Sequence, residues 1–220
     1  MVSPAVEDYL KAIYQLSRDG GPVSTSAIAD RLGVAAGSVT GMLKRLAEQG
    51  LVEHTRYYGA RLTAHGAANA VQTIRRHRVL ELFLVRILGY TWDRVHEEAE
   101  RLEHAVSEEM IDRMAEVLGE PDEDPHGAPI PTTGEEFHET KFPALTEIGA
   151  GRPAVLRRVS DEDPEALRRL AEMNLVPGVE LEVLSQPQSD GPLTLRVGSE
   201  KQTVERSLSE RLMVEPLRER

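Results

Sequence analysis

The 220-residue chain contains no cysteine. This absence excludes disulfides, thiolate zinc sites and cysteine nucleophiles, so any bound metal must be held by oxygen and nitrogen atoms. Aromatic residues make up only 4% of the chain, with three Phe and one Trp, which leaves little lining for a large aromatic pocket. No run approaches about 18 apolar residues, and the first residues lack a basic and apolar leader. We therefore expect no membrane span, no signal peptide and a cytoplasmic protein.

The net charge of −11 is distributed unevenly along the chain. Residues 1–78 carry a net +4, residues 79–140 carry −13 and residues 141–220 carry −2. The N-terminal part alone has the sign of charge that binds a phosphate backbone. The acidic middle part fits binding of divalent cations, but it fits a solvated helical surface equally well.

The first 62 residues have the spacing of a winged helix-turn-helix. We predict a helix over residues 4–19, a short helix over 27–32 that Gly33 ends, and a third helix over 36–49. Residues 51–54 and 61–62 flank a turn at 56–60 and resemble a β-hairpin wing. The alternative is a small helical core whose polar face is only exposed to solvent.

The third helix has the composition of a recognition helix. Val39, Leu43 and Leu46 share its inner face, which leaves short side chains at the front of the outer face and basic ones behind them. Short residues allow a helix to enter a major groove closely, and basic residues reach phosphates. The predicted DNA contacts are Thr25, Ser26, Gly37, Ser38, Thr40, Gly41, Lys44 and Arg45.

A long helix is predicted from Thr63 to Leu88, closed by Gly89. Residues 79–88 would place apolar side chains on nearly all sides of the helix. A small domain does not bury that much apolar surface by itself, which suggests a dimer interface. His77 and Glu81 stand at i and i+4 on this helix and form a potential ligand pair, although an isolated pair of this kind is more often a surface hydrogen bond.

The segment from His96 to His104 is the strongest indication of chemistry. On a helix, His96, Glu100, Glu103 and His104 fall at i, i+4, i+7 and i+8, inside an arc of roughly 100°. Two imidazoles and two carboxylates on one face make a metal-ligand face, whereas any one of them alone is more often solvated. Val95 begins an apolar stripe beside them that would hold the helix against a core.

A stretch rich in proline and glycine between residues 119 and 153 predicts a separate C-terminal module. Residues 153–159, 179–184, 193–197 and 212–217 alternate like short strands around a helix over 164–173, which fits an SH3-like barrel. The predicted fold is mainly α with small β parts. It comprises a DNA-binding domain (1–73), a metal-binding and dimerisation domain (74–140), a linker (141–152) and an SH3-like, FeoA-like domain (153–220).

Taken together, these segments resemble the metal-dependent repressors of the diphtheria-toxin-repressor and manganese-transport-regulator family. The resemblance covers essentially the whole chain. It is carried by the segments Val6-Glu7-Asp8-Tyr9-Leu10, Arg76-His77-Arg78, Val95-His96-Glu97-Glu98-Ala99-Glu100, Leu102-Glu103-His104, Asp124-Pro125-His126-Gly127 and Pro129-Ile130-Pro131.

The resemblance implies two divalent cations per subunit. The primary site would take Asp8, Glu100, Glu103 and His104. The ancillary site would take His77, Glu81, His96 and a carboxylate from the C-terminal module, for which Asp161 is the first choice and Asp163 the second.

The ligand types indicate manganese. In the iron branch of the family a Cys and a Met stand where this chain has Glu100 and Asp8, so the site here offers only oxygen and imidazole donors, which suit Mn²⁺. We expect Fe²⁺, Co²⁺, Zn²⁺ or Cd²⁺ to bind in vitro without activating as well. The short manganese regulators have a Glu where this chain has Lys11, so we expect two separated sites rather than a bridged binuclear one.

The resemblance thus implies a manganese-responsive repressor of metal-uptake genes, with Mn²⁺ as corepressor. Its partners would be palindromic double-stranded DNA and a second copy of the chain, with no membrane, no organic substrate and no enzymatic activity. Three alternatives stay open: an iron-responsive repressor of the same family, a winged-helix regulator that senses an organic ligand, and a carboxylate–histidine metalloenzyme.

Overall fold

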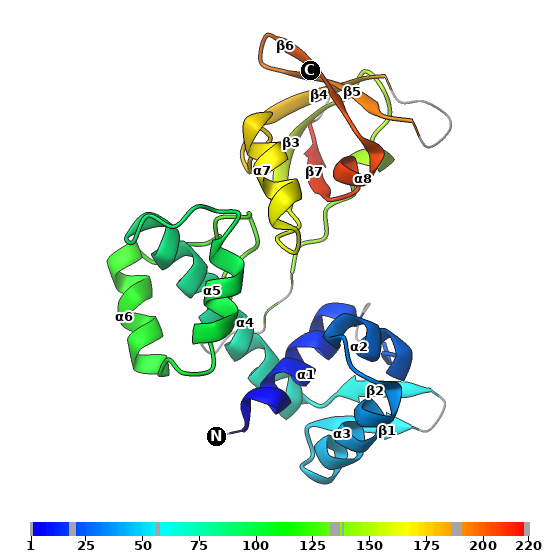
Figure 1. Cartoon of the computed structure of the whole chain (residues 1–220), viewed down its shortest axis with the longest axis vertical. Helices are drawn as coiled ribbons and strands as arrows, with labels where there is room; N and C mark the ends of the chain where they lie inside the picture. Colours follow the sequence, from blue (N-terminus) through cyan, green and yellow to red (C-terminus); the bar gives the residue numbers. More distant parts are fainter. Residues whose placement is uncertain are drawn as a thin grey trace. The chain divides into compact units, whose positions relative to one another are not determined.

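The computed structural model of the chain describes residues 2–17, 21–55, 58–132, 137, 139–185 and 191–217. The chain forms two compact units, each built from more than one segment. The first unit comprises residues 1–77, 102–108 and 131–137, and the second comprises residues 78–101, 109–130 and 138–220. The two units are described separately below (Figure 1).

The first unit contains the predicted winged helix-turn-helix (Figure 1). Ser24 caps the second helix by accepting a hydrogen bond from the Ala27 backbone N–H, and Gly33 ends this helix in the left-handed conformation, with φ of 63°. The wing is an antiparallel pair in which Val52 faces Leu62. The elements are α1 (Pro4–Leu16), α2 (Thr25–Leu32), α3 (Ala36–Glu48), β1 (Val52–Thr55), β2 (Gly59–Leu62) and the start of α4 (Ala64–Arg86).

The core of this unit follows the predicted pattern. Val39, Leu43 and Leu46 are fully buried, as their spacing on the third helix predicted. They pack with buried residues of α1, α2 and the wing in one hydrophobic cluster. The first helix was predicted to continue to residue 19 but ends at Leu16, while residues 18–20 and the wing-turn residues 56 and 57 lie outside the described residues.

The prediction of one continuous helical face from His96 to His104 is wrong. Helix α5 (Val95–Leu102) ends before Glu103, and a turn closed by the Ala105 N–H and the Leu102 carbonyl carries Glu103 and His104. The physical reason is that Glu103 is fully buried and needs a charged partner, which it finds in Lys11 of the first unit. Helix α6 (Glu108–Leu118) follows.

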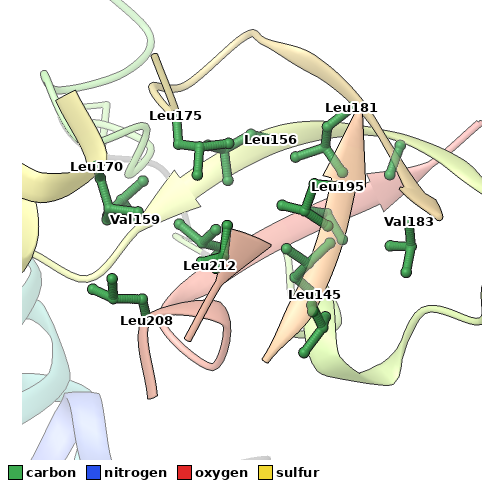
Figure 2. Packing of buried hydrophobic residues seen from close by; sticks show 14 of the residues in the cluster. Leu145, Leu156, Val159, Leu170, Leu175, Leu181, Val183, Leu195, Leu208 and Leu212 are labelled. Carbon is green, nitrogen blue, oxygen red and sulfur yellow. The ribbon is translucent and has the colours of Figure 1, made fainter. Parts of the chain in front are cut away.

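The C-terminal part of the second unit is a five-stranded antiparallel sheet with the order β6-β5-β4-β3-β7. Leucines from the strands and from α7 fill its interior (Figure 2). Strand β6 was not predicted, because only Val204 of its five residues is buried and the strand shows no apolar alternation. The elements are η1 (Leu145–Glu147), β3 (Pro153–Val159), α7 (Pro164–Glu172), β4 (Glu180–Ser185), β5 (Leu193–Val197), β6 (Glu200–Val204), α8 (Arg206–Ser209) and β7 (Leu212–Pro216).

Candidate metal centres and nucleic-acid interface

The outer face of α3 is free of large apolar side chains. Six of the predicted DNA contacts lie on it and are exposed, while Ser26 on α2 is exposed and Thr25 is half-buried. Thr40 donates a hydrogen bond to the Ala36 carbonyl within the helix, which keeps its side chain close to the helix surface. The six exposed residues of α3 are Gly37, Ser38, Thr40, Gly41, Lys44 and Arg45.

The first cluster of metal-ligand types lies in the first unit and consists of Asp8, Glu103 and His104. Each offers a donor atom, and these atoms all lie within 4.8 Å of one another. Nε2 of His104 lies 2.8 Å from Oδ1 of Asp8 and 3.5 Å from Oε1 of Glu103. Asp8 comes from α1 and the other two from the turn after α5, so segments about 95 residues apart in the sequence meet here.

A buried lysine completes the surroundings of Glu103. Nζ of Lys11 donates to both oxygens of Glu103 at 2.8 and 3.0 Å, and Nδ1 of His77 lies 2.6 Å from Oε2 of the same carboxylate. Burial alone would raise the pKa of Glu103, but the hydrogen bond with His77 and the charge of Lys11 outweigh it and lower the pKa. Glu103 is therefore an anion at neutral pH. Lys11 was not predicted from the sequence as a partner of this carboxylate.

Glu7 and Asp8 contact the two ring nitrogens of His104. Nδ1 of His104 lies 2.5 Å from Oε2 of Glu7, opposite the contact of Nε2 with Asp8. Burial alone would lower the pKa of His104, but the hydrogen bond with Glu7 and the charges of Asp8 and Glu103 raise it. Glu7 was not among the predicted site residues, because a glutamate at the start of an amphipathic helix is an ordinary surface feature.

The second cluster lies in the second unit and includes Glu81, His96 and Asp161. Nδ1 of His96 lies 3.1 Å from Oε1 of Glu81 and 3.4 Å from Oδ2 of Asp161. Burial opposes protonation of His96, but its hydrogen bonds with Asp161 and Glu81 raise its pKa to about 10. The same hydrogen bond with His96 lowers the pKa of Asp161, against the effect of burial. These three residues come from α4, α5 and the turn after β3.

Asp124 and His126 extend the second cluster and were not predicted as site residues. Glu81, Asp124 and His126 offer donor atoms within 4.8 Å of one another, and all three side chains are buried. Nδ1 of His126 lies 3.5 Å from Oε2 of Glu81 and makes no hydrogen bond within the described part of the chain. The sequence signal for these two residues is the motif Asp124-Pro125-His126-Gly127, which supported only the resemblance.

The other nitrogen of His126 is occupied by the backbone. Nε2 donates to the Trp92 carbonyl at 2.8 Å, and the two rings stack with centroids 5.7 Å apart. A carbonyl only accepts, so Nε2 carries the proton and Nδ1 faces Glu81. Burial opposes the charged form of His126, but Glu81 raises its pKa to about 9, whereas burial and the charge of Glu81 raise the pKa of Asp124 to about 6. The negative charge of Glu81 thus contributes to both of these raised pKa values.

The two candidates for the C-terminal carboxylate have different environments. Asp161 contacts His96, whereas Asp163 caps α7 by accepting from the Glu165 and Ala166 backbone N–H groups. Asp163 also pairs with Arg211 at 3.2 Å. Geometry therefore favours Asp161 as the member of the second cluster.

Glu100 and His77 were predicted as ligands of the primary and ancillary sites, respectively. Glu100 belongs to the second unit, where its Oε1 lies 3.8 Å from Nε2 of His96, and its side chain is 42% exposed. His77 belongs to the first unit, where it contacts Glu103. Helix α4 nevertheless places His77 one turn before Glu81. Both assignments remain predictions.

Apolar side chains stay exposed where α4 ends and on α6. Most of the apolar segment 79–88 is buried within the protomer, but its last two residues are 50% and 59% exposed. None of the described helices combines the length and the apolar composition that a membrane-spanning helix requires. The large exposed apolar residues of this region are Ile87, Leu88, Tyr90, Met110 and Val117.

A winged helix-turn-helix, two carboxylate–histidine clusters and an SH3-like module together define a class of metal-responsive DNA-binding regulators. Comparisons with known families agree with this class. Residues 1–60 match the family described as "Iron dependent repressor, N-terminal DNA binding domain" and residues 63–132 match its "metal binding and dimerisation domain". Residues 144–216 match the FeoA domain.

Individual relatives support the same assignment over nearly the whole chain. The "Iron-dependent repressor IdeR" of Mycobacterium tuberculosis is 32% identical over 222 residues, which cover 95% of this chain and 96% of the relative. A solved structure described as "Manganese-dependent transcriptional repressor complex with manganese" is 37% identical, with a TM-score of 0.89 over 96% of this chain and 100% of that chain. "ScaR with bound Zn2+" is 32% identical, with a TM-score of 0.82 over 96% and 99%.

The chain belongs to the family of metal-dependent transcriptional repressors that includes the diphtheria toxin repressor. It is a DNA-binding, metal-binding homodimeric regulator of a non-enzymatic family. The prediction of the family and of the fold class is confirmed.

Proposed function

We propose that the chain is a manganese-responsive repressor that controls metal-uptake genes, with Mn²⁺ as corepressor. The observation that carries the proposal is the chemistry of the clusters, which offer carboxylate oxygens and imidazole nitrogens and, in a chain without cysteine, no thiolate. The likeness to a repressor described as manganese-dependent, at a TM-score of 0.89, supports it.

The first cluster would supply Asp8, Glu103 and His104 to one cation, and the family resemblance adds Glu100. The second would supply Glu81, His96 and Asp161, to which the resemblance adds His77. The buried group of Glu81, Asp124 and His126 fits a cation as well, since His126 presents a buried Nδ1 beside a carboxylate. Asp124 and His126 therefore extend the ancillary set in this proposal.

We expect the first cluster to couple metal binding to DNA binding. A bound divalent cation would convert the repulsion between the carboxylates of Asp8 and Glu103 into attraction. The residues would then fasten α1 of the winged helix to the turn after α5. In a two-fold dimer this fixes the spacing of the two recognition helices, so that half-sites of a palindromic operator are bound without a further ordering cost.

An iron-responsive repressor is the second candidate, because relatives at 32% identity are described as iron-dependent. Hard oxygen donors also bind Fe²⁺, and affinity alone ranks Fe²⁺ above Mn²⁺. Selectivity would then depend on coordination geometry and on metal availability. The two candidates differ in which cation activates DNA binding.

The test is retention of genomic DNA fragments by the purified full-length protein. Parallel samples contain a chelator, Mn²⁺, or Fe²⁺ under anaerobic conditions. We expect selective retention of a few fragments with Mn²⁺, weaker retention with Fe²⁺ and none with the chelator. Stronger retention with Fe²⁺ would establish the second candidate, and equal retention in the chelator would contradict a metal corepressor altogether.

A further inference from the structure

We propose that Glu7 is a positioning residue of the first metal cluster, which orients His104 and directs its Nε2 toward the ligands Asp8 and Glu103. The inference rests on the proposed function, in which this cluster binds a divalent cation. Glu7 itself would not touch the metal. It would act through the imidazole.

The geometry around His104 assigns a role to each ring nitrogen. Oε2 of Glu7 lies 2.5 Å from Nδ1, while Nε2 lies 2.8 Å from Oδ1 of Asp8. A carboxylate accepts hydrogen bonds, so the contact with Glu7 keeps a proton on Nδ1. Nε2 is then the nitrogen that presents a lone pair when a cation replaces the proton between His104 and Asp8. Two consecutive residues of α1 thus hold the same imidazole by its two nitrogens.

Glu7 is itself held in place. Its Oε1 accepts from Nη2 of Arg76 at 2.6 Å, so each carboxylate oxygen has a separate partner. Nη2 of Arg76 also donates to Oγ1 of Thr73 at 3.0 Å, and Nη1 donates to Oε1 of Glu108 at 3.1 Å. The side chains of Glu7 and Arg76 are only 13% and 12% exposed. A planar guanidinium fixed at several donors restricts the carboxylate that it holds.

Metal-bound histidines in proteins commonly donate their other ring N–H to a carboxylate in this way. A carboxylate on the distal nitrogen fixes the tautomer and the ring orientation and makes the ligating nitrogen more basic. Loss of such a partner lowers metal affinity by about 10- to 100-fold. A purely structural ion pair between Glu7 and Arg76 would instead affect folding and leave the affinity of the folded protein unchanged.

The experiment measures Cd²⁺ binding by the full-length protein and the tautomer of His104 by ¹⁵N NMR of labelled histidines. We expect Glu7→Ala to weaken the first site by about 10- to 100-fold and to remove the downfield Nδ1–H signal of His104. Glu7→Gln retains an acceptor oxygen but no charge, so a smaller loss with the same tautomer is expected. The affinity of the second site should stay unchanged in both variants.

Glu108→Gln is the matched control, because Glu108 pairs with the same Arg76 but does not take part in the contacts of His104. We expect its first-site affinity to stay within about twofold of wild type. Glu7→Ala with wild-type affinity and an unchanged Nδ1–H signal would overturn the role of Glu7. Equal weakening by Glu7→Ala and Glu108→Gln would also overturn it, and a wild-type protein that binds no cation at this cluster would overturn the proposed function as well.

Discussion

At the scale of single residues, Asp161 and Asp163 show how two carboxylates of the loop between β3 and α7 take separate roles. Asp161 faces His96 in the second cluster, whereas Asp163 accepts two backbone hydrogen bonds at the start of α7. A capping carboxylate stabilises its helix. A carboxylate in a ligand cluster is repelled by the neighbouring carboxylates as long as no cation is bound. The two residues should therefore respond differently to the same substitution.

We predict that Asp161→Asn weakens metal binding at the second cluster by at least about 10-fold, since a charged ligand is lost. Asp163→Asn should leave that affinity unchanged, because Asn is itself a good N-cap. Asp163→Ala should lower the thermal unfolding temperature, because the N-cap of α7 is lost. Calorimetric metal titration and thermal unfolding of the three variants check these expectations. A greater loss of metal affinity in Asp163→Asn would make Asp163 the ligand.

At the scale of elements, α4 approaches the backbone just before β1 so closely that only glycine fits at one position. A Cβ added to Gly66 would overlap the Leu51 carbonyl, whereas a Cβ on Gly41 of α3 meets nothing within 4 Å. We expect Gly66→Ala to destabilise the first unit by about 1–3 kcal/mol and Gly41→Ala to stabilise it by up to about 1 kcal/mol. Chemical denaturation followed by circular dichroism measures both. A stable Gly66→Ala variant would mean that α4 can move away from the Leu51 backbone without cost.

Another element-scale contact joins Glu139 to α4 and β3. Oε1 of Glu139 pairs with Arg78 and Oε2 pairs with Arg158 at 3.1 Å. Burial would raise the pKa of Glu139, but the charges of Arg78 and Arg158 outweigh it and lower the pKa below its ordinary value of 4.5. A carboxylate with a lowered pKa in the folded state stabilises the protein above pH 4.5, and this contribution is lost as the pH falls through the lowered pKa.

We therefore predict that Glu139→Gln lowers the free energy of unfolding by about 1 kcal/mol at neutral pH, allowing for partial exposure of the carboxylate. The difference from wild type should shrink as the pH falls below 4.5. Urea denaturation at a series of pH values gives the comparison. A difference that persists at low pH would show that the amide disturbs packing rather than charge.

Sequence periodicity predicted some elements well and others poorly, for physical reasons. The inner face of α3 was predictable because burial of Val39, Leu43 and Leu46 is determined by local helical geometry. The end of α5 was not, because it depends on the buried contact of Glu103 with Lys11, which lies 92 residues earlier. His126 was missed as a site residue since its partner Glu81 is brought near only by the tertiary fold.

At the scale of the whole molecule, we propose that the exposed apolar residues at the end of α4 and on α6 belong to the dimer interface. Leu88 is 59% exposed in the protomer, and Leu217 in the C-terminal module is 37% exposed. We predict that Leu88→Glu raises the dissociation constant of the dimer at least about 10-fold, because a charge would be buried at an apolar contact. Leu217→Glu is the control and should leave the dimer intact. Sedimentation equilibrium measures both, and an unaffected Leu88→Glu dimer would place the interface elsewhere.

Trp92 is the single tryptophan of the chain, and it lies where two parts of the second unit meet. Its ring stacks on His126 of the second cluster and packs against the core of the C-terminal sheet, while the next residue, Asp93, pairs with Arg168 of α7. The indole is therefore a built-in optical probe whose emission originates from this one place. We expect a change in its fluorescence on adding a cation to report on the second cluster, without labels and in the unmodified protein.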